Sequence, residues 1–195
     1  MKPTYRLMIL TFGLLLLSAC QHNRKKNNVT TAIFDNWQQV SSWSISGKMA
    51  INDGHNNGSG KFNWQQADMT TVAKFSAPLG QGSWSIEEKT DQTVLTSSKH
   101  GVTQAATAEQ LISNELGWYF PWNNLKYWLR GYQTSLQSNN ILPIHHKLYD
   151  SFNDDGWHIV FQSWVNTPMG MLPKKIKAKK GPYSIKLIIY SWDIL

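Results

Sequence analysis

The chain has 195 residues with a formal net charge of +7, and 41% of its residues are hydrophobic. This length is typical of one domain, and a single cysteine excludes a fold built on internal disulfide bonds. The modest positive charge suits anionic lipid headgroups or an acidic partner protein, and we expect no nucleic acid because the N-terminal segment predicts export.

Residues 1–19 have the layout of a secretory signal peptide. Two basic residues precede an apolar run over 7–17, and two small residues come directly before Cys20. The run is shorter than the about 20 residues that a membrane-spanning helix needs. Residues 17–20 also fit a bacterial lipobox, in which the cysteine is diacylated and becomes the new N-terminus. We therefore predict a signal peptide and a lipid anchor on Cys20; the alternative is an ordinary cleavage site beside an incidental cysteine.

The residue after the cysteine bears on the destination of the protein. It is Gln21, not the aspartate that resembles an inner-membrane retention signal in enterobacterial lipoproteins. We therefore expect anchoring in the outer membrane, on its periplasmic face, through N-terminal acyl chains. Residues 20–31 are polar without periodicity and predict a lipidated, flexible tether. The remaining residues, 32–195, form the predicted folded domain, and we expect it to be monomeric.

A short helix is expected around 31–40, and strands follow it. From Trp43 onward, apolar residues recur at every second position, which is typical of strands with one apolar face. A turn at 53–58 separates the first two strands and predicts a hairpin. The strands expected in this half are 43–51, 60–66, 70–76, 83–88 and 93–98.

The middle of the chain predicts two helices. The first opens at 107–108 and ends at Gly117, and the second is capped by Asn123 or Asn124 and extends to Gly131. The last part of the chain alternates again, with strands expected at 157–162, 175–179 and 183–192.

A sheet with one apolar face must bury that face, here under the two or three short helices. We therefore expect a mostly β (α+β) fold in which an antiparallel sheet wraps into a partial barrel. Eleven side chains have positions that direct them inward: Trp43, Met49, Phe62, Trp64, Phe75, Trp84, Ile86, Trp128, Trp157, Ile159 and Phe161. Each could be ordinary core, whereas together they could line an apolar cavity for ligands of variable shape.

The sequence has no sign of catalytic chemistry. It lacks a Gly-x-Ser-x-Gly elbow and a His-Glu-x-x-His motif, and its one cysteine is the expected lipidation site. His145 and His146 are adjacent rather than spaced for a metal, and residues 154–155 predict a turn. We expect no enzymatic activity, no metal and no cofactor. A lipid-modifying hydrolase would need a nucleophile constellation that the sequence does not contain.

Short motifs follow the lipobox in a fixed order: FNWQQ at 62–66, APLG at 77–80, ELGW at 115–118, LKYWLRG at 125–131 and DGW at 155–157. This ordered set resembles the LolB family of outer-membrane lipoprotein receptors, almost to the C-terminus. The resemblance implies an open antiparallel half-barrel with about three helices over a hydrophobic cavity. It also implies a function: taking acylated lipoproteins from the periplasmic carrier LolA and incorporating them into the outer membrane, without nucleotide or metal. The alternative is a membrane-anchored scaffold of the cell envelope that transfers no acyl chains.

Two surface features have competing interpretations. Leu79 lies between Pro78 and Gly80 in a turn, and the resemblance implies that these three residues form a membrane-insertion loop. The alternative is a leucine folded back onto the rim of the sheet. The lysines of residues 174–180 lie along one strand, where they either protect a solvated sheet edge from aggregation or contact lipid headgroups or the carrier.

Overall fold

A computed structural model describes residues 40–133, 142–143, 151–168 and 170–194 of the chain. The expected signal peptide, Cys20 and the tether lie outside the described residues, as do His145 and His146. The helix expected at 31–40 also lies outside them, except for Val40, which belongs to no helix or strand.

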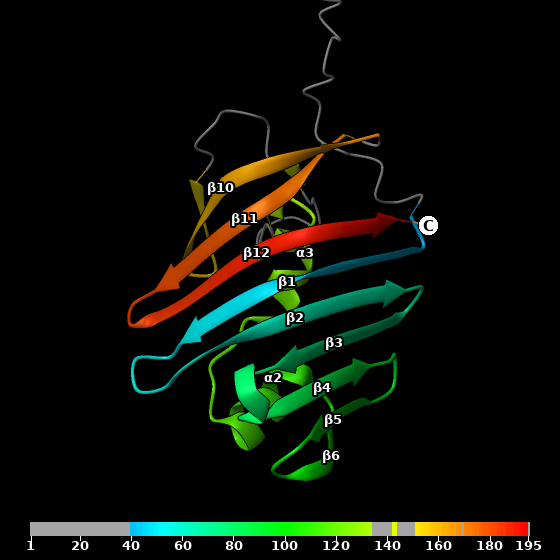
Figure 1. The fold of residues 1–195 in the computed structure, drawn as a ribbon. Coiled ribbons are helices and arrows are strands. Elements are labelled where there is room, and N and C mark those ends of the chain that lie inside the picture. The colour runs from blue at the N-terminus through cyan, green and yellow to red at the C-terminus, as the bar shows by residue number, and fades with distance from the viewer. Residues whose placement is uncertain (1–39, 134–141, 144–150, 169, 195) are drawn as a thin grey trace, which may run out of the picture. The chain divides into compact units, whose positions relative to one another are not determined.

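Ten strands form one open antiparallel sheet in the order β6-β5-β4-β3-β2-β1-β12-β11-β10-β9 (Figure 1). A two-stranded pair, β7 with β8, lies apart from it. The strands are β1 (Ser42–Asn52), β2 (Asn57–Ala67), β3 (Thr70–Ser76), β4 (Ser83–Glu88), β5 (Thr93–Ser97), β6 (Gly101–Ala105), β7 (Tyr132–Gln133), β8 (Leu142–Pro143), β9 (Ser151–Asp154), β10 (Trp157–Thr167), β11 (Gly170–Lys180) and β12 (Tyr183–Ile194).

The large sheet consists of two meanders that lie side by side, the first strand of one paired with the last strand of the other. Strands β1 to β6 follow one another as hairpins, as do β9 to β12, and β1 pairs with β12 along almost its whole length. The first and last strands therefore lie in the middle of the sheet, and its edges are β6 and β9. The segment between the meanders carries the helices, and α3 (Trp122–Leu129) lies behind the central strands in the view of Figure 1.

The described residues contain two short α-helices, α2 (Ala108–Leu111) and α3 (Trp122–Leu129). Thr107 caps α2 by accepting a hydrogen bond from the Gln110 amide, and a π-helical turn, η4 (Ile112–Leu116), continues it to a left-handed Gly117. The expected start of α3 was wrong: the helix begins at Trp122 after Pro121, before the two asparagines proposed as caps. Its buried residues recur at helical spacing, so that one face packs on the sheet.

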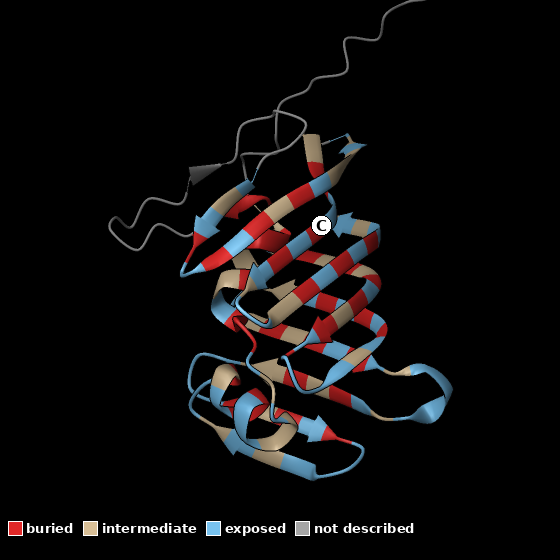
Figure 2. Cartoon of the chain, turned by 90° about the vertical axis from the view of Figure 1, so that its left-hand side faces the viewer, coloured by how far each residue is buried: buried red, intermediate tan, exposed pale blue. Residues whose placement is uncertain are grey.

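The predicted strand faces are confirmed, because buried and exposed residues alternate along β1 to β4 and the start of β10 as the sequence pattern indicates (Figure 2). The bounds of β3 and β4 coincide with the expected ones. The sequence did not predict β6 or β9. Strand β6 has no buried side chain and β9 has only four residues, so that neither carries a clear apolar alternation.

All eleven side chains predicted to point inward are buried in one hydrophobic cluster between the sheet and the helices. The described elements all belong to the unit that begins at Thr31. A chain that begins at residue 21 therefore keeps every described element and the whole described core. No described helix is long and apolar enough to cross a membrane.

Candidate functional site

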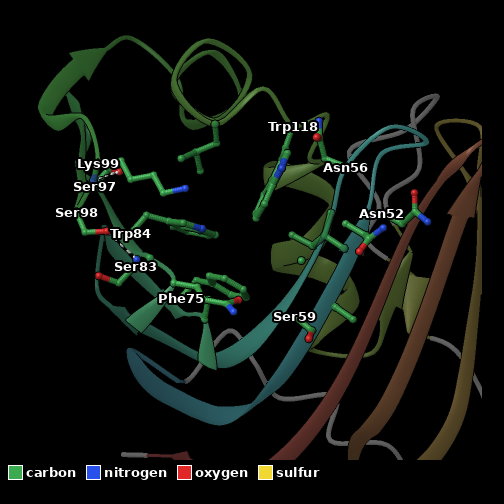
Figure 3. A pocket seen from close by; sticks show the side chains of 18 of the residues that line it. Asn52, Asn56, Ser59, Phe75, Ser83, Trp84, Ser97, Ser98, Lys99 and Trp118 are labelled. Carbon is green, nitrogen blue, oxygen red and sulfur yellow. Dashed lines mark hydrogen bonds between the residues drawn. The ribbon is translucent and has the colours of Figure 1, made fainter. Parts of the chain in front are cut away.

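An open pocket of about 740 Å³ lies between the end of the β1–β2 hairpin, the β3–β4 loop and the η4 turn (Figure 3). Its apolar walls come chiefly from Phe75, Trp84 and Trp118, and its rim is polar. The rim includes Asn52, Asn56, Ser59, Ser97, Ser98 and Lys99. A pocket with aromatic walls and a polar rim suits a ligand that has an apolar part and a polar end.

Sheet register builds two of the three aromatic walls. Phe75 and Trp84 are direct cross-strand partners on the inner face, and their rings stack with centroids 5.5 Å apart. Trp118 follows the left-handed Gly117 and meets both rings edge-on, at 6.1 Å from Phe75 and 6.4 Å from Trp84. Trp118 is only partly buried, so that it forms the outer wall of the pocket.

One wall residue has unused hydrogen-bonding capacity. The indole Nε1 of Trp84 is buried and has no hydrogen-bond partner among the residues that the structure describes. A buried donor without an acceptor costs about 1–3 kcal/mol relative to a satisfied one. Because this nitrogen is buried, an acceptor on a ligand could reach it only after the neighbouring side chains move.

A structured turn forms one side of the mouth. The Asp53 carboxylate accepts hydrogen bonds from the backbone amides of Asn56, at 2.5 Å, and His55, at 2.9 Å. These amides, that of Asn56 first, stabilise the ionised form and lower the pKa of Asp53 below its ordinary value. The turn thus holds Asn56 on the pocket rim.

A second part of the inner face is filled with side chains and lies under α3. Trp122 packs against Trp64 with ring centroids 4.6 Å apart, and Trp128 packs edge-on to Trp157 at 5.9 Å. Both helix tryptophans are also hydrogen-bonded to strand carboxylates. Trp122 Nε1 donates to Glu88 of β4 at 3.0 Å, and Trp128 Nε1 donates to the buried Asp154 of β9 at 2.8 Å. Glu88 also pairs with Lys126 of α3.

The residues predicted for a cavity occupy different places in the structure. Phe75 and Trp84 line the open pocket, Met49 borders a groove beside the β3–β4 loop, and Trp43 borders a hollow near α3. Seven others are packed inside the core: Phe62, Trp64, Ile86, Trp128, Trp157, Ile159 and Phe161. Sequence reasoning missed Trp118, Trp122 and Asp154. Trp118 and Trp122 lie outside the periodic segments, and Asp154 was assigned to a turn.

The β3–β4 loop presents Leu79 to solvent. Its side chain is 96% exposed, so that it is not folded back onto the rim. Its backbone is left-handed, with φ 54° and ψ 28°, within the 3-10 turn η3 (Pro78–Gly80). That conformation is unfavourable for an L residue other than glycine by roughly 1–2 kcal/mol. An exposed apolar side chain on unfavourable backbone is a feature that folding alone does not explain.

Within the described ranges there is no cluster of three or more histidine, cysteine or acidic side chains that could hold a metal ion. The fold and the pocket define a class: an open, curved β-sheet protein whose inner face, partly covered by helices, encloses an apolar interior with an aromatic opening. The chain is similar in fold to a LolA superfamily protein from Nitrosomonas europaea, with a TM-score of 0.50 and 10% identity over 80% of this chain and 87% of the other. It is also similar to a DUF1329 family protein from Desulfovibrio piger, with a TM-score of 0.55 and 9% identity over 83% and 88%.

Sequence comparison identifies the family within that class. The family model for the outer membrane lipoprotein LolB matches residues 41–192. The outer-membrane lipoprotein LolB of Marinomonas sp. is 30% identical over 98% of this chain and 99% of its own, and that of Coxiella burnetii is 27% identical over 92% and 89%. The chain therefore belongs to the LolB family. It is an outer-membrane lipoprotein without enzymatic activity that receives lipoproteins from LolA.

Proposed function

We propose that the protein takes the acyl chains of its lipoprotein cargo into the pocket between Phe75, Trp84 and Trp118, and then incorporates the cargo into the outer membrane. The observation that carries this proposal is the position of the pocket beside an exposed apolar loop. Ala77 and Pro78, which precede Leu79, belong to the pocket lining. A chain that leaves the pocket on this side meets the loop first.

The energetics favour direct transfer between cavities. Each methylene that enters water costs about 0.8 kcal/mol, so that acyl chains must not cross solvent between carrier and receptor. A second apolar opening placed against the mouth of the carrier removes most of that barrier. Net transfer then requires that the receptor hold the chains at least as well as LolA does, and that the bilayer hold them better than either.

The pocket also suits the polar end of an acyl chain. If the neighbouring side chains moved to expose the Trp84 indole nitrogen, an ester or amide carbonyl beside it would accept the hydrogen bond that lacks a partner in the described structure. The side chains under α3 would contact the chains only after this helix separates from the sheet. If α3 moved away from the sheet, the side chains that were predicted for the cavity and are now packed in the core would line an open cavity.

We further propose the processing and anchoring that the N-terminal sequence predicts. Residues 1–19 are removed as a signal peptide, Cys20 carries the lipid, and residues 20–31 link it to the domain formed by 32–195. The domain acts as a monomer. Mass spectrometry of the protein purified from membranes tests this assignment: a diacylated peptide that begins at Cys20 supports it, and an unmodified cysteine contradicts it.

Transfer in solution tests the main proposal. A chain that begins at residue 21 would be mixed with LolA loaded with a radiolabelled lipoprotein, and the two proteins would then be separated. We expect the label to move to this protein. Label that stays on a carrier able to deliver to another LolB family member would contradict acyl-chain transfer and favour an anchored scaffold.

The loop requires a separate assay. We expect a Leu79→Glu variant to accept the label normally but to release much less of it into liposomes, because a charged tip cannot enter the bilayer. Met69→Glu is the matched control, since Met69 is also a large exposed residue, 73% exposed, in the β2–β3 turn. Equal loss of release in both variants would show a general charge effect and not a role for the loop.

A further inference from the structure

We propose that the outer face of the sheet, beside the Leu79 loop, is a binding surface for the phosphate headgroups of anionic phospholipids. This inference rests on the proposed function, because it assumes that the loop meets a bilayer. The surface, called the lysine face below, consists of seven exposed lysines on the outer side of β3, β2, β1, β12 and β11. They are Lys48, Lys61, Lys74, Lys175, Lys177, Lys179 and Lys186.

Charge is strongly one-sided on this face. The five strands are neighbours in the sheet, and the only acidic residue among them is Asp193, near the C-terminal end of β12. None of the seven lysines forms a salt bridge with any residue that the structure describes. The charges of the lysine face are therefore available to an anionic partner.

Strand register places some of these charges directly against one another. Lys48 lies opposite Lys61 in the β1–β2 pair, and Lys177 lies opposite Lys186 in the β11–β12 pair. Like charges in such positions destabilise a sheet. An anion bound between them would replace this repulsion by attraction.

Protection of a sheet edge does not account for the lysines, and that interpretation of residues 174–180 was wrong. Strand β11 lies between β10 and β12, and β1 and β2 are also interior strands, whereas the edges are β6 and β9. The backbone groups of these lysine-bearing strands are paired on both sides. The charges therefore need another explanation.

A groove of about 570 Å³ joins the lysine face to the loop. Lys48, Lys61 and Lys186 line it on the sheet side, and Pro78 and Leu79 line it on the loop side. Ile188, which is 39% exposed, lies opposite both Lys48 and Lys175 in the register and adds an apolar floor. A headgroup phosphate fits among the ammonium groups, with its glycerol and first methylenes against the apolar side chains.

This arrangement would orient the pocket as well as bind the membrane. Ala77 and Pro78 line both the groove and the aromatic pocket. A bilayer that engages the lysine face and Leu79 is therefore adjacent to the pocket mouth. The groove and the mouth together would place acyl chains beside the membrane that receives them.

Vesicle flotation tests the proposal. The probe is vesicles of phosphatidylcholine, with or without phosphatidylglycerol, and the protein is the chain that begins at residue 21. We expect binding to require phosphatidylglycerol and to weaken with salt, because screening shortens the reach of surface charges. A lysine near an anionic membrane contributes about a fivefold factor in affinity. The Lys48→Gln/Lys61→Gln variant should therefore bind about 30-fold more weakly.

The control is the single variant Lys89→Gln, compared with the single variant Lys61→Gln. Lys89 is exposed, lies off the lysine face and outside the lining of the aromatic pocket, and pairs with Glu87. This control should keep wild-type binding. Binding that does not depend on phosphatidylglycerol, or equal loss in the two variants, would overturn the proposal. Circular dichroism and thermal unfolding of both variants exclude loss of fold as the cause.

Transfer from LolA in the absence of lipid separates this inference from the proposed function. The Lys48→Gln/Lys61→Gln variant should accept the labelled lipoprotein as well as wild type does. If it loses acceptance, the lysine face docks an acidic protein surface instead, and the headgroup proposal is wrong. If the wild type accepts no cargo but still binds anionic vesicles, the proposed function is wrong, whereas headgroup binding by the lysine face is supported.

Discussion

The inner side of the sheet has two regions that differ in how they are closed. Under α3, tryptophans pack in two pairs, Trp64 with Trp122 and Trp128 with Trp157, and indole–carboxylate hydrogen bonds hold the helix to β4 and β9. Beyond η4, Phe75 and Trp84 lie against the partly exposed Trp118, and an open pocket remains beside them. Aromatic residues thus build a stable core in one region and a ligand-accessible wall in the other. The difference lies in the covering element rather than in the sheet.

The largest expected effect is a difference in unfolding free energy between substitutions in the two regions. Trp64→Ala should lower the free energy of unfolding by about 3–5 kcal/mol, because it leaves a cavity under α3. Trp118→Ala should lower it by only about 1 kcal/mol, since this side chain is partly exposed, yet it should impair cargo acceptance. Denaturant unfolding and the transfer assay measure the two quantities. Equal loss of stability in the two variants would abolish the distinction between core and wall.

The hydrogen bond between Trp128 of α3 and Asp154 of β9 predicts the next largest effect on stability. Asp154→Ala would leave the Trp128 indole buried without this acceptor, which should cost about 1–3 kcal/mol of unfolding free energy. Asp155→Asn is the matched control. Asp155 is exposed, its charge pair with Lys180 is long, at 3.9 Å, and asparagine tolerates its left-handed backbone, with φ 48°. We expect a change below about 0.5 kcal/mol there. If both variants unfold at the same denaturant concentration, the bond to Trp128 does not hold the helix.

The loop beside the open region should behave in the opposite way. Leu79→Asn should raise the free energy of unfolding by up to about 1 kcal/mol, because asparagine tolerates left-handed backbone better than leucine. The same variant should release less cargo into liposomes. Thermal unfolding together with the release assay checks both expectations. A variant that loses stability would show that Leu79 packs in the free protein.

The smallest effect concerns the turn at the pocket mouth. Because backbone amides lower the pKa of Asp53, its ionised carboxylate stabilises the fold above its ordinary pKa, and this contribution disappears as pH falls through the lowered pKa. Wild type should therefore lose stability more steeply than Asp53→Asn between about pH 5 and about pH 2. Urea unfolding at a series of pH values measures the difference. Parallel curves would mean that the amides do not bind the carboxylate.

The strand faces could be predicted because the sequence alternates wherever one face is buried. Trp84 and Ile86, for example, were assigned inward from spacing alone, and both are buried. The resemblance to the LolB family likewise depended on short ordered motifs, and the family is confirmed.

The division of the interior could not be predicted in this way. Periodicity tells which side chains face inward, but not which of them a helix will cover. That depends on long-range pairs such as Trp128 with Asp154 and Trp122 with Glu88, which are 26 and 34 residues apart. The lysine face has the same origin, because it arises from the pairing of β1 with β12 at opposite ends of the domain.

Photo-crosslinking from the cargo tests most directly whether acyl chains enter the open region. A lipoprotein that carries a diazirine in its acyl chains would be delivered by LolA to the chain that begins at residue 21, irradiated, and mapped by mass spectrometry. We predict crosslinks at Phe75, Trp84, Trp118 and their pocket neighbours. Crosslinks confined to the outer face of the sheet, or an absence of crosslinks despite transfer of the label, would contradict acyl-chain binding in this pocket.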